Sequence, residues 1–352
     1  MKRWRGFLAT VLVAVCMISC TAGNRAANQR LSIYNWTYYT PDSVIEKFEQ
    51  EFNVTIIYDQ FTTNEELYAK LMATRGGAGY DIVFPSGDFV PIMIEQDMLE
   101  KMDHSKLPNL QYIDPVVLEK AVYDPNMEYS VPYYFGAAGI IVNTARVPNY
   151  EENWSIFARQ DLRGRMVMLD DMREVMGAAL SYLGYSINTT NPAEVAEARD
   201  LINTVWKPNI VKFDSESFGK GYAAGDFWVV HGYAEAVYEE IEGDTELLEN
   251  TAFFIPQEGG PGYIDSMCIL KGARNIDMAH EFINFIHRPD IYAEFVDYFS
   301  FPSTVNEAAR ELKEEEPLYE MEDLLNTTIA VELGEDIELY RTAWFDSIRS
   351  GE

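Results

Sequence analysis

The sequence predicts an α/β protein in which open sheets are flanked by helices. Between residues 31 and 86, strand-like and helix-like runs alternate, which is typical of parallel strands joined by helical crossovers. The run Ile82-Val83-Phe84 is apolar without alternation, as expected for a strand that is buried on both faces. The chain has 352 residues, more than a single hydrophobic core usually serves, so we expect two domains.

The first domain is expected to begin with three strands separated by two helices. Pro41 suits the first turn of the first helix, because its missing N–H would have no partner there. Thr63 and Glu66 form a T-x-x-E capping box ahead of the second helix. The strands are predicted over 31–36, 53–58 and 80–86.

A strand over 139–143 is expected to carry the chain into a second domain. A strand-like run over 263–270 could lead back to the first domain. The other predicted strands are 165–169 and 227–232, and the predicted helices begin near Asp171 and span 192–206, 275–287 and 337–348.

The N-terminus has the features of an export signal. Three basic residues precede an apolar run that is too short to span a bilayer. Ser19 followed by Cys20 resembles the site at which bacterial lipoprotein signals are cut and the new terminal cysteine is acylated. We expect 1–19 to be a signal peptide and 20–30 a lipidated tether, with an ordinary signal peptide as the alternative.

The charge and the cysteines limit the partners and the stabilising bonds. A formal net charge of −30 repels nucleic acid and anionic lipid headgroups and attracts cations. If Cys20 carries a lipid, Cys268 has no cysteine to pair with, so no intramolecular disulfide is expected.

Motifs of several enzyme classes are missing from the sequence. No two of the four histidines lie three or four residues apart, which disfavours a zinc site on a helix. The chain contains neither a G-x-S-x-G elbow nor a phosphate-binding P-loop. We therefore expect no metal and no other cofactor.

Polar and aromatic residues follow the predicted strands at their carboxyl ends, where an open α/β sheet places its ligand. Asp171 and Glu174 can face the same way on a helix, although they could also merely complement the helix dipole. Asp265 interrupts an apolar strand and would need a cation opposite it if buried. Separated acids with aromatic residues between them describe a linear diamine or triamine. The other residues at strand ends are Trp36, Tyr39, Ser86, Asp88 and Tyr233.

Several separated motifs occur in the order found in the spermidine/putrescine-binding proteins of polyamine ABC transporters, and the chain resembles that family over nearly its whole mature length. The motifs are YNWTYY (34–39), YDIVFPS (80–86), the run 129–143, LDDMREV (169–175) and YIDS (263–266).

The resemblance implies a two-lobed periplasmic-binding-protein fold, with an open mixed sheet in each lobe and a ligand cleft between the lobes. The lobes would comprise 31–138 with 265–309 and 139–264 with 310–352. Such a protein delivers putrescine or spermidine to ABC permease subunits without catalysis. It would be an exported bacterial lipoprotein at the periplasmic face of a membrane, held there by its lipid alone.

The resemblance also implies the ligand contacts. Tyr233 and Tyr263 stand where this family tends to have tryptophan, Phe301 stands for a tyrosine, and Asp88 occupies an aromatic position. These departures leave the choice among polyamines open. The implied contacts are Trp36, Thr37, Tyr39, Ser86, Asp88, Asp171, Glu174, Tyr233, Tyr263, Asp265 and Phe301.

Three other functions stay open at this point. Tyr133 and Tyr134, together with acids, could capture a ferric ion. Asp171 and Glu174 could be the acid and base of a glycoside hydrolase. A lipid-anchored surface adhesin is the third.

Overall fold

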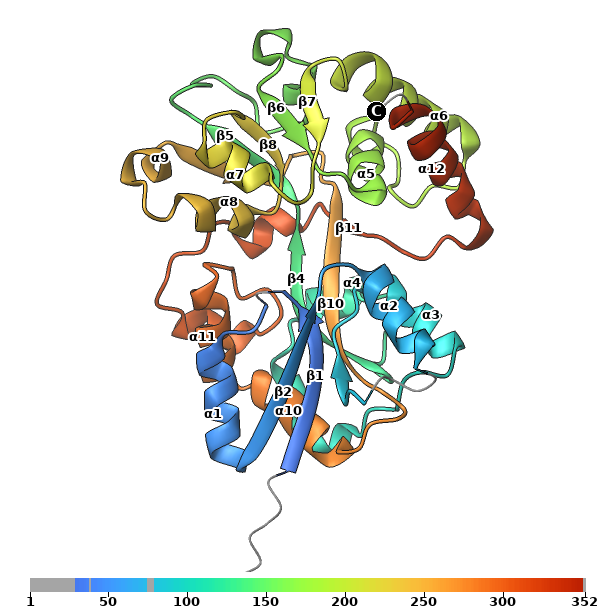
Figure 1. The fold of residues 1–352 in the computed structure, drawn as a ribbon, viewed down its shortest axis with the longest axis vertical. Helices are drawn as coiled ribbons and strands as arrows, with labels where there is room; N and C mark the ends of the chain where they lie inside the picture. Colours follow the sequence, from blue (N-terminus) through green and yellow to red (C-terminus); the bar gives the residue numbers. More distant parts are fainter. Residues whose placement is uncertain (1–28, 38, 75–78, 351–352) are drawn as a thin grey trace, which may run out of the picture.

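The computed structural model describes residues 29–37, 39–74 and 79–350, so the predicted signal peptide and Cys20 lie outside the described residues. Within these ranges the strands form one six-stranded and one five-stranded sheet. Helices flank each sheet, and the two sheets occupy the lower and upper halves of the molecule in Figure 1. The predicted two-lobed α/β fold is confirmed.

The first sheet has the strand order β11-β10-β3-β1-β2, with β4 paired to β10. β1 runs parallel to β2 and β3, as the alternating pattern predicts, whereas β10 is antiparallel to β3 and β4. Its strands are β1 (Gln29–Trp36), β2 (Val54–Phe61), β3 (Ile82–Val83), β4 (Ser130–Ala137), β10 (Pro261–Ile269) and β11 (Thr328–Ile329).

The helices of the first lobe cover this sheet with apolar faces. α1 buries Val44 and Phe48, and the Phe48 ring packs against Phe282 of α10 at 5.0 Å. Thr63 caps α2 by accepting from the Glu66 amide at 3.1 Å, but the Glu66 carboxylate accepts from Thr62, one residue earlier than the predicted box requires. The helices are α1 (Asp42–Phe52), α2 (Asn64–Ala73), α3 (Phe89–Glu95), α4 (Pro115–Lys120), α10 (Ile276–Ile286) and α11 (Pro289–Tyr298).

The second sheet has the order β7-β6-β8-β5-β9, in which β6 is parallel to β7 and β8, and β5 is antiparallel to β8 and β9. Its strands are β5 (Gly139–Asn143), β6 (Met166–Met168), β7 (Ile210–Phe213), β8 (Val229–Gly232) and β9 (Thr251–Phe254). Its helices are α5 (Met172–Tyr182), α6 (Pro192–Leu201), α7 (Phe218–Ala223), α8 (Ala234–Ile241), α9 (Thr245–Glu249) and α12 (Ile337–Ala343).

Short helical turns complete the structure. The predicted helix over 192–206 continues from α6 into a π-helical turn, and α12 does the same. The 3₁₀ turns are η1 (His104–Lys106), η2 (Pro108–Tyr112), η3 (Trp154–Ala158), η4 (Gln160–Leu162), η6 (Glu307–Leu312), η7 (Met321–Leu324) and η8 (Gly334–Asp336), and the π turns are η5 (Ile202–Trp206) and η9 (Trp344–Ile348).

The chain passes between the lobes from β4 to β5, from β9 to β10 and from β11 to α12 (Figure 1). The sequence places a lobe boundary between 264 and 265, but β10 spans that point and pairs continuously with β4, apart from a register shift. Tyr319 and Leu324 pack in the core of the first lobe, and the chain joins the core of the second lobe again around α12. Among the described residues, no helix is both long enough and apolar enough to cross a membrane.

Candidate functional site

Asp265 is a buried carboxylate held by two neutral hydroxyls. It lies in β10, next to the register shift, and is 5% exposed. Ser86 donates to Oδ1 at 2.6 Å, and Tyr39 donates to Oδ2 at 2.8 Å. Three of the predicted site residues therefore meet, although they are far apart in the sequence. The hydroxyls orient both oxygens without neutralising the charge, so the carboxylate can still bind a cation.

The surroundings of Asp265 favour its neutral form. Burial raises the pKa of the Asp265 carboxyl to about 7, and the negative charge of Asp88 acts in the same direction. The hydrogen bonds from Ser86 and Tyr39 oppose this rise. A cationic ligand at this carboxylate would reverse the effect of burial, because an opposite charge favours the ionised form.

Asp171 and Glu174 have different positions at the start of α5. Asp171 is exposed and is the N-cap residue, accepting from the Glu174 amide at 3.0 Å. Glu174 is 9% exposed, and its Oε2 atom has no hydrogen-bond partner in the described part of the chain. Burial, and then the charge of Asp171, raise the pKa of Glu174 well above its usual value. Capping therefore explains Asp171 but not Glu174.

Tyrosine rings connect the two lobes near these acids. Tyr233, directly before α8, meets Tyr263 of β10 edge to face at 5.9 Å. Tyr263 lies 6.4 Å from Tyr134, which stacks on Phe301 at 4.4 Å. Phe301 is 1% exposed, so its ring supports Tyr134 from within the core.

Carboxylates of both lobes influence the pKa of the Tyr233 phenol. Burial raises the pKa of the Tyr233 phenol well above its usual value, and charges from both lobes act in the same direction. Glu174 and Asp171 belong to the second lobe, and Asp265 to the first. The carboxylates of the two lobes are thus close enough to influence the same ring.

Trp36 and Thr37 are fixed at the end of β1. The Trp36 indole donates to the carbonyl of Phe84 at 2.8 Å and lies 4.5 Å from the Phe61 ring. The Thr37 hydroxyl donates to the Phe61 carbonyl at 3.2 Å. These bonds tie the end of β1 to its neighbours on both sides, β2 and the segment after β3.

Asp88 lies directly before α3 and is half-buried. Burial raises the pKa of its carboxyl to about 6. Arg173 opposes this rise and Asp171 adds to it, and both belong to the second lobe. Asp88 therefore already has a positive charge in its surroundings.

Sequence reasoning missed two groups of this region, Glu235 and His231. Glu235 is half-buried in the first turn of α8, and burial raises the pKa of its carboxyl to about 7. Its charge raises the pKa of both Tyr263 and Tyr319, so it belongs to the electrostatic surroundings of the tyrosines. Its position just after a strand end, like that of Glu174, could have identified it.

The two tyrosines that could capture a ferric ion, Tyr133 and Tyr134, already form other hydrogen bonds. Tyr133 donates to the Tyr39 carbonyl at 2.5 Å, and the hydroxyls of Tyr134 and Tyr319 are 2.7 Å apart. Burial raises the pKa of both Tyr133 and Tyr134 well above the usual value. This disfavours the phenolate form that a ferric ion would require.

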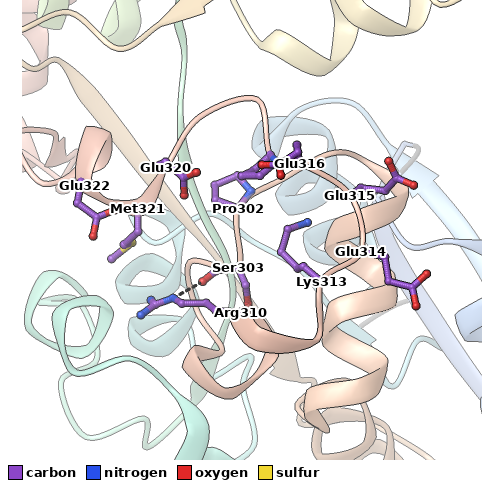
Figure 2. A pocket seen from close by; sticks show the side chains of 11 residues that line it. Pro302, Ser303, Arg310, Lys313, Glu314, Glu315, Glu316, Glu320, Met321 and Glu322 are labelled. Atoms are coloured by element: carbon purple, nitrogen blue, oxygen red, sulfur yellow. Dashed lines mark hydrogen bonds between the residues drawn. The ribbon is translucent and has the colours of Figure 1, made fainter.

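A surface pocket of about 400 Å³ lies beside η6 and η7, and none of the candidate site residues lines it (Figure 2). Its basic groups already have partners, because Arg310 bonds to Asp114 and Lys313 to Asp297. All of its other charged lining residues are glutamates. We do not assign it to the candidate site.

Comparisons with known proteins agree on one family. The model of a family described as bacterial extracellular solute-binding protein matches residues 43–322. The spermidine/putrescine-binding periplasmic protein of Salmonella typhimurium is 36% identical over 314 residues, which cover 89% of this chain and 87% of that protein.

Solved structures show the same fold. The crystal structure of a lipoprotein of Treponema pallidum is 52% identical with a TM-score of 0.87, covering 91% of this chain and 99% of that one. A spermidine/putrescine ABC transporter substrate-binding protein of Streptococcus pneumoniae is 26% identical with a TM-score of 0.78, covering 90% and 99%.

Proposed function

Because the chain belongs to the bacterial extracellular solute-binding proteins, and among them to the spermidine/putrescine-binding group, we propose that it captures a polyamine between its lobes for an ABC permease. The observation that carries this proposal is the buried Asp265 carboxylate, whose hydrogen-bond partners are neutral hydroxyls. Such a group suits an ammonium ion, which supplies the missing positive charge and further donors.

The other contacts suit the remainder of a linear polyamine. Glu174, with Asp171 beside it, offers a second ammonium site on the opposite lobe. The Tyr233 and Tyr263 rings lie between the acids and can cover the methylene chain while facing its ammonium groups. The remaining proposed contacts are Trp36, Thr37, Tyr39, Ser86, Asp88 and Phe301, the last acting through Tyr134.

Calorimetry with putrescine, cadaverine, spermidine and spermine tests this function directly. We expect Asp265→Asn to weaken binding by about 2 to 5 kcal/mol, because it removes one partner of a buried charge pair. Asp277→Asn is the matched control, since Asp277 is an exposed carboxylate in a surface ion pair with Lys106. Absence of binding in the wild-type protein, or equal affinities in the two variants, would contradict the proposal.

We also propose that the protein is a carrier, not a catalyst, and that it is held at the periplasmic face of a membrane. Residues 1–19 would be removed, and Cys20 would carry the lipid. Mass spectrometry of the mature N-terminus tests the lipid, and Cys20→Ser should release the protein from the membrane. Recovery of unchanged polyamine after prolonged incubation tests the absence of turnover.

A further inference from the structure

The imidazole of His231 is completely buried in β8, where its backbone pairs with Ile140 of β5. Neither ring nitrogen has a hydrogen-bond partner among the described residues. Burying an unpaired polar group is unfavourable, so such a side chain needs an explanation.

The Glu174 carboxylate is the polar group beside this imidazole. Nε2 of His231 lies 3.8 Å from Oε2 of Glu174, an oxygen that also lacks a hydrogen-bond partner in the described ranges. A hydrogen bond requires about 3 Å, so a small rotation of Glu174 would satisfy both atoms. Trp154 meets the imidazole edge to face at 5.1 Å and is itself fixed by donating to Gly259 at 2.7 Å.

The other charged and titratable groups around Glu174 do not supply that bond. Asp171, on the same helix, disfavours the ionised form of Glu174. Arg173 favours it, but the Arg173 guanidinium donates to Asn188 at 2.6 Å and to Val331 at 3.3 Å. Tyr233 follows β8, and burial keeps its phenol protonated.

We propose that His231 is a positioning residue, whose neutral imidazole donates Nε2–H to Glu174 and holds the carboxylate ionised toward an ammonium group of the ligand. This inference rests on the proposed polyamine function. On binding, the Glu174 carboxyl releases its proton to solvent, Oε2 accepts from His231, and the other oxygen accepts from the ammonium. Burial lowers the pKa of His231 to about 3, so the ring acts as a donor without becoming charged.

Two variants of His231 separate this role from packing. His231→Leu removes the donor, whereas the side-chain nitrogen of His231→Gln can take the place of Nε2. At pH 7 we expect polyamine affinity to fall about 10- to 100-fold in the leucine variant, the usual contribution of a hydrogen bond to a charged group. The glutamine variant should stay close to wild type.

The pH profile gives the decisive readout. The deficit of His231→Leu should shrink as pH rises, because Glu174 then ionises without help. Val230→Ala is the control for packing, since it alters the neighbouring buried residue of β8, which packs in a hydrophobic cluster that does not include Trp154. It should lower stability without changing the shape of the profile.

Equal losses in the leucine and glutamine variants at every pH would overturn the inference while leaving the proposed function intact. Failure of the wild-type protein to bind polyamines would instead contradict the proposed function itself. If the leucine variant does not fold, nitrogen NMR of histidine-labelled wild-type protein decides. The His231 proton should reside on Nε2 and shift on ligand addition; a proton on Nδ1, or no shift, would refute the role.

Discussion

At the scale of single residues, the sequence identifies the acids but not their environments. Tyr39, Ser86 and Asp265 are expected at the site, yet their mutual hydrogen bonds join residues that no local pattern connects. Glu235 and His231 are missed because the expectations follow the positions of a resembling family. An unpaired buried atom, such as Nε2 of His231, becomes visible only when all its neighbours are placed.

The raised pKa of Asp265 predicts that polyamine affinity falls with acidity. The carboxyl is increasingly protonated below its pKa of about 7, and an ammonium group must then displace a proton. Calorimetry in buffers of different ionisation enthalpy should therefore show proton release on binding, and weaker binding at pH 6 than at pH 8. Asp265→Asn should reduce this proton release; an unchanged value would show that Asp265 does not titrate with the ligand.

The raised pKa of Asp265 affects folding stability in the opposite direction, since acidity weakens ligand binding but stabilises the fold. The pKa of Asp265 is higher in the folded protein than the value of about 3.9 for an unfolded aspartate. The folded state therefore binds more protons between those values, so this residue makes the ligand-free protein more stable as pH falls from about 7 to 4. Thermal unfolding of wild type and Asp265→Asn over this range measures the contribution.

Glu235 and Asp88 are the two candidates to bind the third ammonium group of spermidine. The positive charge of Arg173 lowers the pKa of Asp88 and so favours its ionised form without a ligand. The charge of Glu235, by contrast, raises the pKa of a neighbouring tyrosine. Glu235→Gln should therefore weaken the binding of spermidine by about 1 to 3 kcal/mol and the binding of putrescine by less. Asp88→Asn is the matched comparison, and a larger selective loss there would assign the third site to Asp88.

At the scale of elements, the strands predicted in the first half of the first sheet are those that carry a recognisable apolar run. The parallel strands β1, β2 and β3 follow from their apolar runs. The strands that sequence reasoning missed include β7, β9 and β11, which stand at sheet ends in the described residues. These three strands have two to four residues, too few for a long apolar run, whereas the edge strand β2 has eight residues and is predicted.

Asp171 is the N-cap residue of α5, and two substitutions there distinguish its structural role from its electrostatic role. Asp171→Asn keeps an oxygen for the Glu174 amide, so stability should change little, while loss of the charge weakens polyamine binding. Asp171→Ala should in addition lower the free energy of unfolding by about 1 kcal/mol. Denaturant unfolding and calorimetry on both variants check this, and equal stability losses would show that the charge, not the cap, stabilises α5.

At the scale of the whole molecule, the acids that would hold the ligand belong to different lobes. Asp265 lies in β10 of the first sheet, and Glu174 lies in α5 of the second lobe. A ligand that bridges them should favour the closed arrangement. X-ray scattering should show a smaller radius of gyration with saturating polyamine. Asp265→Asn at the same ligand concentration should remain expanded, and compaction of both proteins would point to a cause other than this bridge.

The crossing segments also impose an order on folding. The strands of the second sheet lie in one stretch from Gly139 to Phe254, whereas the first sheet needs β10 and β11 from late in the chain. During synthesis the second lobe can therefore complete its sheet while β3 and β4 still lack their pairing partner β10. Open strand edges invite association with other chains, so the vulnerable period for aggregation lasts until β10 has emerged.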